Sequence, residues 1–150
     1  MAQLLVKNYL HIVFSTKYRL PLISGEIEEE VFRYLGGICK NIECFPLAVG
    51  GYLDHVHILC NLSKKITLIK LMEEVKSESS KWVKTLSSEL EHFYWQRGYA
   101  AFSVAPAQIE RVNNYILNQK KHHQKTGYPD ELRFMLQKNQ MDYDERYLWD

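Results

Sequence analysis

The chain has 150 residues, enough for one folded domain with a buried core, and we expect a single domain over residues 1–150. Hydrophobic residues make up 46% and charged residues 25%, without internal repeats or low-complexity runs, which excludes a disordered or solenoid protein. Because the net charge is only +1, a nucleic-acid-binding surface would have to be a local patch.

Charged residues segregate along the sequence. Lysines gather within 64–84 and 120–125, whereas acidic residues gather within 26–30 and 142–145. This segregation is compatible with a basic face on a nearly neutral protein, and equally with ordinary solvated helix surfaces. Charge alone leaves both interpretations open.

The N-terminal residues lack the apolar run of a signal peptide, and no later run is long enough to span a membrane, so we expect a cytoplasmic protein. Cys39, Cys44 and Cys60 are odd in number and too loosely spaced for a typical zinc site. We expect them to be free, buried thiols.

The first half of the chain predicts a strand, a helix and two more strands. β-branched and aromatic residues predict a strand over 9–16, and apolar residues at three-to-four spacing predict a helix over 26–40. Two further strands are predicted over 43–49 and 53–62, with the turn of a hairpin at Gly50–Gly51 between them.

The second half predicts a long amphipathic helix over about 67–90 and a fourth strand over 99–104. A third helix follows through about 108–124, with Pro106 in its first turn, and a weak helical segment lies near 131–138.

This order is the ferredoxin-like, split βαβ plan of an α+β fold. We expect an antiparallel sheet with helices on one face and an added C-terminal helix, with a core over about 9–124 and a tail over 125–150. Because such sheets serve many functions, function must be argued from individual side chains.

The first chemically informative motif is Asp54-His55-Val56-His57. His55 and His57 are two residues apart on a predicted strand, so both side chains leave the same face and form half a site for a divalent metal. The alternative is an ordinary pair of core or surface histidines, since the motif is short.

The second is Tyr115 followed by Gln119. On a helix these residues are one turn apart and share a face, while Ile109, Val112 and Ile116 form an apolar line on another face. Taken alone, the pair could equally be an exposed tyrosine packed over a glutamine.

Together, these motifs resemble the small HUH-type transposases of the insertion-sequence 200/605 group, including the relatives associated with repeated extragenic palindromes. HUH denotes histidine, hydrophobic residue, histidine, here His55-Val56-His57. The glycines and Asp54 before the motif, the segment 93–104 and the tail 143–149 are also similar to that family.

The resemblance implies a metal-dependent DNA-strand transferase. Its metal, Mg²⁺ or Mn²⁺, would be held by His55, His57 and Gln119 and would polarise a phosphate oxygen. Tyr115 on the late helix would be the nucleophile, forming a covalent 5′-phosphotyrosine. The implied substrate is single-stranded DNA with hairpins at element ends, and the implied assembly is a homodimer in a bacterial or archaeal cell.

Basic residues are candidates for contacts with DNA phosphates, and an exposed Tyr94 could stack on bases, whereas Trp95 is better explained as a core residue. The candidate phosphate contacts are Lys76, Lys81, Lys84, Arg97, Lys120 and Lys121.

Three alternatives remain open. A domesticated relative that processes chromosomal palindromic repeats would share the same residues and reaction. A non-catalytic nucleic-acid-binding module is suggested by residues 97–104, which are similar to the aromatic signature of RNA-recognition domains, but an inserted alanine and a place on the last strand disagree with it. A metal-free phosphoesterase would need two His-x-Thr or His-x-Ser motifs, which the sequence lacks.

Overall fold

The computed structural model describes residues 2–150. Its strands and its longer helices fall close to the predicted elements. The strands are β1 (Tyr9–Ser15), β2 (Pro46–Tyr52), β3 (His55–Asn61) and β4 (Ala100–Ser103). The helices are α1 (Glu28–Asn41), α2 (Leu68–Val83), α3 (Ile109–Leu117), α4 (Gln119–His122) and α5 (Tyr128–Lys138), with 3-10 turns η1 (Lys17–Arg19), η2 (Ser88–Leu90) and η3 (Pro106–Gln108).

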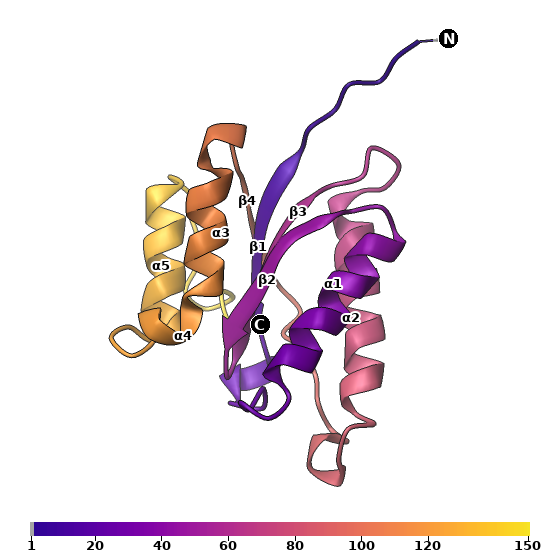
Figure 1. The fold of residues 1–150 in the computed structure, drawn as a ribbon. Coiled ribbons are helices and arrows are strands. Elements are labelled where there is room, and N and C mark those ends of the chain that lie inside the picture. Colours follow the sequence, from indigo (N-terminus) through magenta and orange to yellow (C-terminus); the bar gives the residue numbers. More distant parts are fainter. Residues whose placement is uncertain (1) are drawn as a thin grey trace.

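The four strands form one sheet in the order β2-β3-β1-β4, and every neighbouring pair is antiparallel. This is the strand order of the split βαβ plan, which confirms the predicted fold class. Helices α1 and α2 cover one face of the sheet, while α3 and α5 lie on the other (Figure 1). Both faces of the sheet are therefore covered. A second buried region lies between the sheet and helices α3 and α5.

The alternation of side chains along the central strands decides what each face holds. On β1, Leu10, Ile12 and Phe14 enter the core beneath α1 and α2. Val13 points the other way and packs with residues of α5 and β4. The first face is almost wholly apolar, and the second carries polar groups that need partners.

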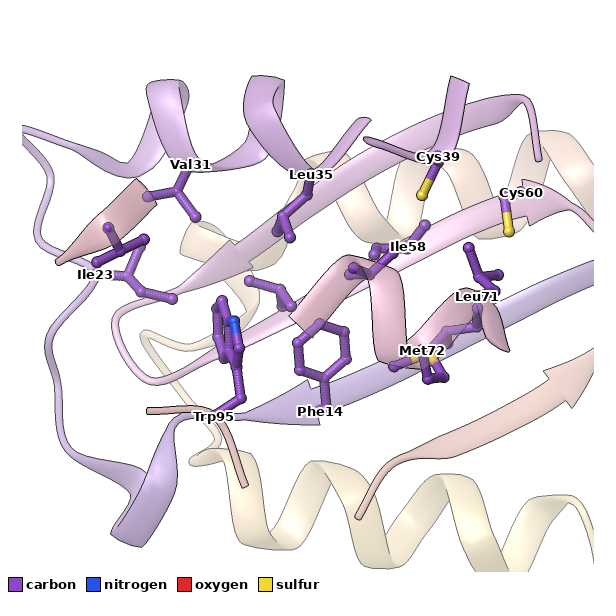
Figure 2. Close-up of a cluster of buried hydrophobic side chains, with 14 of the residues drawn as sticks. Phe14, Ile23, Val31, Leu35, Cys39, Ile58, Cys60, Leu71, Met72 and Trp95 are labelled. Atoms are coloured by element: carbon purple, nitrogen blue, oxygen red, sulfur yellow. The ribbon is translucent and has the colours of Figure 1, made fainter. Parts of the chain in front are cut away.

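The apolar core lies between the sheet and helices α1 and α2 (Figure 2). Trp95 is buried there against Phe14, with 4.9 Å between ring centroids, and its Nε1 donates a hydrogen bond to Ser79 at 2.8 Å. The core placement of Trp95 is thereby confirmed, whereas Tyr94 is 54% exposed. The three cysteines are buried free thiols, as predicted.

Two element boundaries differ from the sequence prediction. Gly50–Gly51 does not form the hairpin turn but lies inside β2, and the chain reverses at Leu53, whose φ of 51° is left-handed. The second helix ends at Val83 rather than near residue 90. The longer helix was predicted because apolar residues continue at helical spacing, but the last of them, Leu90, is buried in the separate turn η2.

Gly50 has a packing role rather than a turning role. A Cβ atom built on it would lie 2.5 Å from the carbonyl oxygen of Ile116 in α3. Its backbone is not left-handed, so the position requires glycine for space and not for conformation. The missing side chain lets α3 approach the sheet next to His57, which pairs with Gly50 across the strands.

None of the helices within residues 2–150 combines the length and apolar character needed to cross a bilayer.

Candidate metal and tyrosine site

His55 and His57 lie side by side on β3 and face the interior beneath α3 and α5. Val56 between them enters the opposite core, as the two-residue period predicts. Both imidazoles are fully buried. Nδ1 of His55 lies 2.8 Å from Oδ1 of Asp54, and Nδ1 of His57 lies 2.8 Å from Nε2 of His11. A partner at Nδ1 thus fixes the orientation of each ring, and the Nε2 atom faces the centre of the site.

Tyr115 and Gln119 reach the same centre from the segment after the sheet. The helix expected over 108–124 is interrupted at Asn118, so Tyr115 lies in α3 and Gln119 begins α4. Oε1 of Gln119 is 3.0 Å from Nε2 of His55. The Tyr115 ring meets His57 edge-on, with 5.7 Å between centroids. The four side chains singled out in the sequence therefore meet within one chain.

The residue at the centre, Glu131 of α5, was missed by the sequence reasoning. Its Oε1 lies 3.2 Å from Nε2 of His55 and 3.1 Å from Nε2 of His57. Its Oε2 accepts a short hydrogen bond from the Tyr115 hydroxyl and another, at 3.1 Å, from Nε2 of Gln119. Nothing local in the sequence marks this glutamate, because only the packing of α5 on β1 and β4 brings it to the histidines.

Burial and hydrogen bonding give His55 a different pKa from His57 and His11. Burial lowers the pKa of His57, and it lowers the pKa of His11 to about 3. Burial also opposes a charge on His55, but hydrogen bonds to Asp54 and Glu131 outweigh it and raise the pKa of His55 to about 9. Without an ion, His55 therefore carries a positive charge at neutral pH, whereas His57 and His11 stay neutral.

The pKa values of the Glu131 carboxyl group and the Tyr115 phenol are shifted in opposite directions. Burial disfavours the charge on Glu131, but hydrogen bonds from His123 and from the two β3 histidines outweigh it and hold the pKa of Glu131 well below its usual range. Burial, and then the charge of Glu131, raise the pKa of Tyr115 above its ordinary value. At neutral pH a neutral phenol therefore faces an ionised carboxylate.

The donor set of this cluster fits a divalent cation. His55, His57 and Glu131 each offer one ligand atom, all within 4.8 Å of one another and all from buried residues. Two imidazoles and a carboxylate are donors that first-row transition metals accept. The buried His-x-His pair with a glutamate could therefore bind a metal.

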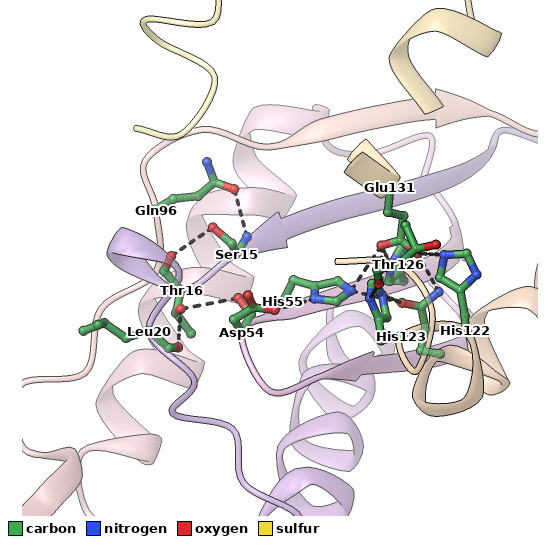
Figure 3. A network of polar contacts seen from close by, with 12 residues as sticks. Ser15, Thr16, Leu20, Asp54, His55, Gln96, His122, His123, Thr126 and Glu131 are labelled. Carbon is green, nitrogen blue, oxygen red and sulfur yellow. Dashed lines mark hydrogen bonds and ion pairs between the residues drawn. The ribbon is translucent and has the colours of Figure 1, made fainter. Parts of the chain in front are cut away.

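A polar network extends behind Asp54 and holds it against His55 (Figure 3). The carbonyl oxygen of Asp54 accepts a hydrogen bond from the backbone N–H of Thr16 at 2.8 Å. The Ser15 hydroxyl donates to the carbonyl of Thr16 at 2.9 Å, and Oε1 of Gln96 accepts from the backbone N–H of Ser15 at 2.8 Å. The ring that faces the centre is thus anchored through β1 to the loop before β4.

A groove between α3 and α5, with a volume of about 540 Å³, leads from the surface to Tyr115 and Glu131. Phe134, which is 66% exposed, forms part of its wall. Arg111 and Lys138 also line it, and both are exposed. The Tyr115 phenol is therefore reachable from solvent, although His55 and His57 are fully buried.

Lys76 has a structural role that its expected contact with DNA does not explain. Its Nζ donates hydrogen bonds to the carbonyl oxygens of Gln96, Arg97 and Gly98 at 2.8, 2.9 and 2.7 Å. Burial lowers the pKa of its ammonium group to about 8. All three donors of the ammonium group are in use, so we do not retain Lys76 as a phosphate contact.

The other predicted phosphate contacts differ in their surroundings. Lys84 donates to Oγ of Ser80 at 2.7 Å and lies 4.0 Å above the Tyr94 ring. Lys120 lies 3.7 Å from a carboxylate oxygen of Glu28 at the start of α1. Lys81, Arg97 and Lys121 are exposed.

Fold and site together define a ferredoxin-like protein with a buried histidine–carboxylate cluster beside a tyrosine. The family model described as "Transposase IS200 like" matches residues 5–119, and the chain belongs to this family. It is a transposase of the IS200/IS605 family, related to the tyrosine transposases, and it falls among enzymes that cleave and transfer DNA.

Individual relatives agree with this assignment. The transposases for insertion sequence element IS200 from Salmonella typhimurium LT2 and Salmonella typhi are each 29% identical over 114 residues, covering 73% of this chain and 74% of theirs. A Deinococcus radiodurans R1 protein assigned as a transposase shares the fold at 18% identity and a TM-score of 0.62, over 79% of this chain and 95% of its own. A REP-associated tyrosine transposase bound to a REP hairpin shares it at 12% identity and a TM-score of 0.58, over 82% and 73%.

Proposed function

We propose that this transposase cuts and rejoins single-stranded DNA through a covalent bond between Tyr115 and a 5′-phosphate, at a metal site that includes His55, His57 and Gln119. One observation carries the proposal. A nucleophilic phenol, two imidazoles and an amide oxygen from separate elements converge in one chain at the end of a solvent-reachable groove.

In the cleavage step, the Tyr115 hydroxyl oxygen bonds to phosphorus, and the bond from phosphorus to the 3′-oxygen breaks. The phenol loses its proton and the departing 3′-oxygen gains one. One phosphate diester replaces another, so the joining step is the reverse attack by a 3′-hydroxyl and requires no nucleotide cofactor. The hydrogen bond to Glu131 orients the Tyr115 hydroxyl group before attack.

The raised pKa of Tyr115 opposes this step, because a phenol is a weak nucleophile until it loses its proton. His55, His57 and Gln119 would hold a divalent ion here, and such an ion would supply a Lewis acid for the phosphate and for the phenolate. The histidines are fixed from behind by Asp54 and His11, so their nitrogens are oriented before a substrate arrives.

The groove between α3 and α5 is the proposed path of the strand to be cut. Arg111 and Lys138 would contact its phosphates, and the exposed Phe134 ring would stack on a base. The REP-associated relative, which was solved with a hairpin, supports hairpin DNA as the substrate class. Lys81, Arg97, Lys120 and Lys121 remain proposed contacts for the hairpin, and a homodimer remains a prediction.

The proposal is tested by incubating the protein with end-labelled single-stranded oligonucleotides that carry a hairpin and by following adducts on denaturing gels. We expect a protein–DNA adduct with Mn²⁺ or Mg²⁺, and none with chelator or with Tyr115→Phe. Tyr147→Phe, which alters a tyrosine that is 65% exposed, is the matched control and should form the adduct normally. Adduct formation by Tyr115→Phe would refute the proposal.

Because all four side chains meet within one chain, we expect the site to act in cis. A mixture of the His57→Ala and Tyr115→Phe variants should then form no adduct. Adduct formation in the mixture would show that tyrosine and histidines come from different subunits.

A further inference from the structure

We infer that a cleft just beyond the C-terminal end of β1 binds unpaired nucleotides of the substrate strand, on the opposite side of the cleaved phosphate from the groove between α3 and α5. This inference rests on the proposed function, because it assigns a second segment of the same DNA strand. The cleft has a volume of about 570 Å³. The lining residues that carry the inference are Lys17, Tyr18, Arg19, Tyr94, Arg97 and Trp149.

The cleft lies beyond the metal site along β1. His11, near the start of this strand, lines the groove. Further along, Val13 pairs with His57 on β3. Ser15, the last residue of the strand, pairs with His55, and the cleft begins two residues later. Groove, histidines and cleft therefore follow one another in the direction of β1, as the successive contacts of one DNA strand would.

Aromatic packing connects the cleft to the metal site. The ring of Tyr128 in α5 stacks on His55, with 4.3 Å between ring centroids. The same ring meets Trp149 edge-on at 6.3 Å, and Trp149 lines the cleft. One buried ring therefore separates the cleft from a proposed metal ligand, so nucleotides in the cleft would be close neighbours of the cleaved phosphate.

The turn after β1 forms one wall and has an uncommon conformation. Tyr18 and Arg19 both have left-handed backbones, with φ of 61° and 55°, although neither is glycine. The Thr16 hydroxyl fixes the turn by donating a hydrogen bond to the carbonyl oxygen of Leu20 at 2.7 Å (Figure 3). Such backbones are unfavourable and concentrate at binding and active sites. Here the turn leaves Tyr18 75% exposed.

The segment before β4 forms another wall and is bonded to the turn. The backbone N–H of Lys17 donates to the carbonyl oxygen of Tyr94 at 2.8 Å. The backbone N–H of Gln96 donates to the carbonyl oxygen of Ser15 at 2.9 Å. Backbone hydrogen bonds therefore set the shape of the cleft before a ligand binds.

Exposed rings and cations lie next to one another in the cleft. The Lys17 ammonium group lies 5.4 Å from the centre of the Tyr18 ring and 5.9 Å from that of the Tyr94 ring. The Arg19 guanidinium group lies 4.6 Å from the centre of the Trp149 ring. A base stacked on Tyr18 would thus have a cation beside it for its phosphate.

The charge of the cleft is predominantly positive. Lys17, Arg19 and Arg97 line it, and Asp150 is the acidic residue among the described residues of the lining. Cations bind phosphates, and exposed aromatic rings stack on the bases of single strands. Paired bases offer only their edges in the grooves of a duplex, so a ring stacks on bases where the strand is unpaired. The chemistry of the cleft therefore fits the unpaired DNA next to a hairpin.

Removal of the Tyr18 ring tests the inference by fluorescence anisotropy with single-stranded oligonucleotides that carry a hairpin. The parent protein for all variants is Tyr115→Phe, which keeps the strand intact. Tyr18→Gly suits the left-handed backbone, so the turn stays folded, and it should weaken binding by about 5- to 100-fold. Tyr18→Phe retains the ring and should recover most of this affinity.

Tyr143→Gly makes the same change at a tyrosine that is 37% exposed and lies outside the cleft lining, so it should bind as the parent protein does. Thermal unfolding of each variant establishes that it is folded. Equal affinities of Tyr18→Gly and the parent protein would overturn the inference.

Oligonucleotides that lack one base at each position in turn identify the base that the ring contacts. Loss of the base that stacks on Tyr18 should weaken binding to the parent protein but not to Tyr18→Gly, which has already lost the contact. The base whose loss no longer matters in Phe134→Ala should lie on the other side of the phosphate that Tyr115 attacks. Bases on the same side for both variants would overturn the inference.

The outcomes separate this inference from the proposed function. Parent-like binding by Tyr18→Gly, with weakened binding by Phe134→Ala and an adduct on Tyr115 in the wild type, would overturn the inference and leave the proposed function standing. A wild-type protein that neither binds single-stranded DNA nor forms the adduct would refute the proposed function, and the inference with it.

Discussion

Replacing Gly50 with alanine should slow DNA cleavage without altering any group that takes part in the chemistry. The new Cβ atom would lie 2.5 Å from the carbonyl oxygen of Ile116 and 3.1 Å from its Cγ2, both in the helix that carries Tyr115. Ordinary contacts begin near 3.4 Å, so the helix backbone must retreat by roughly 1 Å, a misplacement that can cost about 100-fold in rate. The added crowding should also lower the free energy of unfolding by about 1–3 kcal/mol.

The assay is the initial rate of adduct formation under saturating metal, together with the midpoint of thermal unfolding. Gly37→Ala is the matched control, because its Cβ would meet nothing within 4 Å inside α1. That change should leave the rate unaltered and stabilise the protein by about 0.5–1 kcal/mol through helix propensity. A Gly50→Ala protein that forms adduct at the wild-type rate would refute the reasoning that close approach of α3 positions the phenol.

Three further predictions follow from the site and its surroundings. Phe134→Ala removes a ring that would stack on a base, and Arg111→Ala removes a phosphate contact, so each should weaken binding of single-stranded DNA by about 5- to 100-fold in fluorescence anisotropy. Unchanged affinity in both variants would exclude the groove as the path of the strand. Lys76→Met should lower the free energy of unfolding by about 1–3 kcal/mol in urea titrations and leave DNA affinity unchanged, because the ammonium group of Lys76 donates its hydrogen bonds to backbone carbonyls. A loss of DNA affinity without a loss of stability would contradict the structural role of Lys76. The pKa of His55 is raised to about 9 in the folded protein, so its stabilisation is fully present below the unfolded pKa of about 6.5 and is lost as the pH rises through 9. In the presence of chelator, the free energy of unfolding should therefore fall by up to about 3 kcal/mol over that range, whereas the stabilisation by Mn²⁺ should grow, because the metal binds neutral imidazole. Thermal midpoints that do not change with pH would contradict this linkage.

The parts of the site that follow from local periodicity were predictable. His55 and His57 share a face because the strand has a period of two, and Tyr115 and Gln119 share a face because helical residues four apart do. The break at Asn118 did not disturb this, since Gln119 still reaches His55. Glu131 was not predictable in this way, because its position depends on how α5 packs across β1 and β4.

The glycine pair shows why local signals can mislead. Gly50–Gly51 has the composition of a hairpin turn, yet both residues lie in β2. Gly50 is required by the approach of Ile116, a contact between residues far apart in the chain. Similarly, Lys76 resembled a surface lysine by its place on an amphipathic helix, but the loop before β4 folds back and occupies its ammonium group.

The covalent intermediate is the most direct test of the whole account. The wild-type protein should be trapped with Mn²⁺ and a hairpin oligonucleotide, digested with protease and nuclease, and analysed by peptide mass spectrometry. We predict that the nucleotide remnant is attached to the peptide containing Tyr115, through a phosphate to the phenol, and only when metal is present. A remnant on another residue, or a strand that is cut without any covalent intermediate, would contradict the assignment of Tyr115 as the nucleophile.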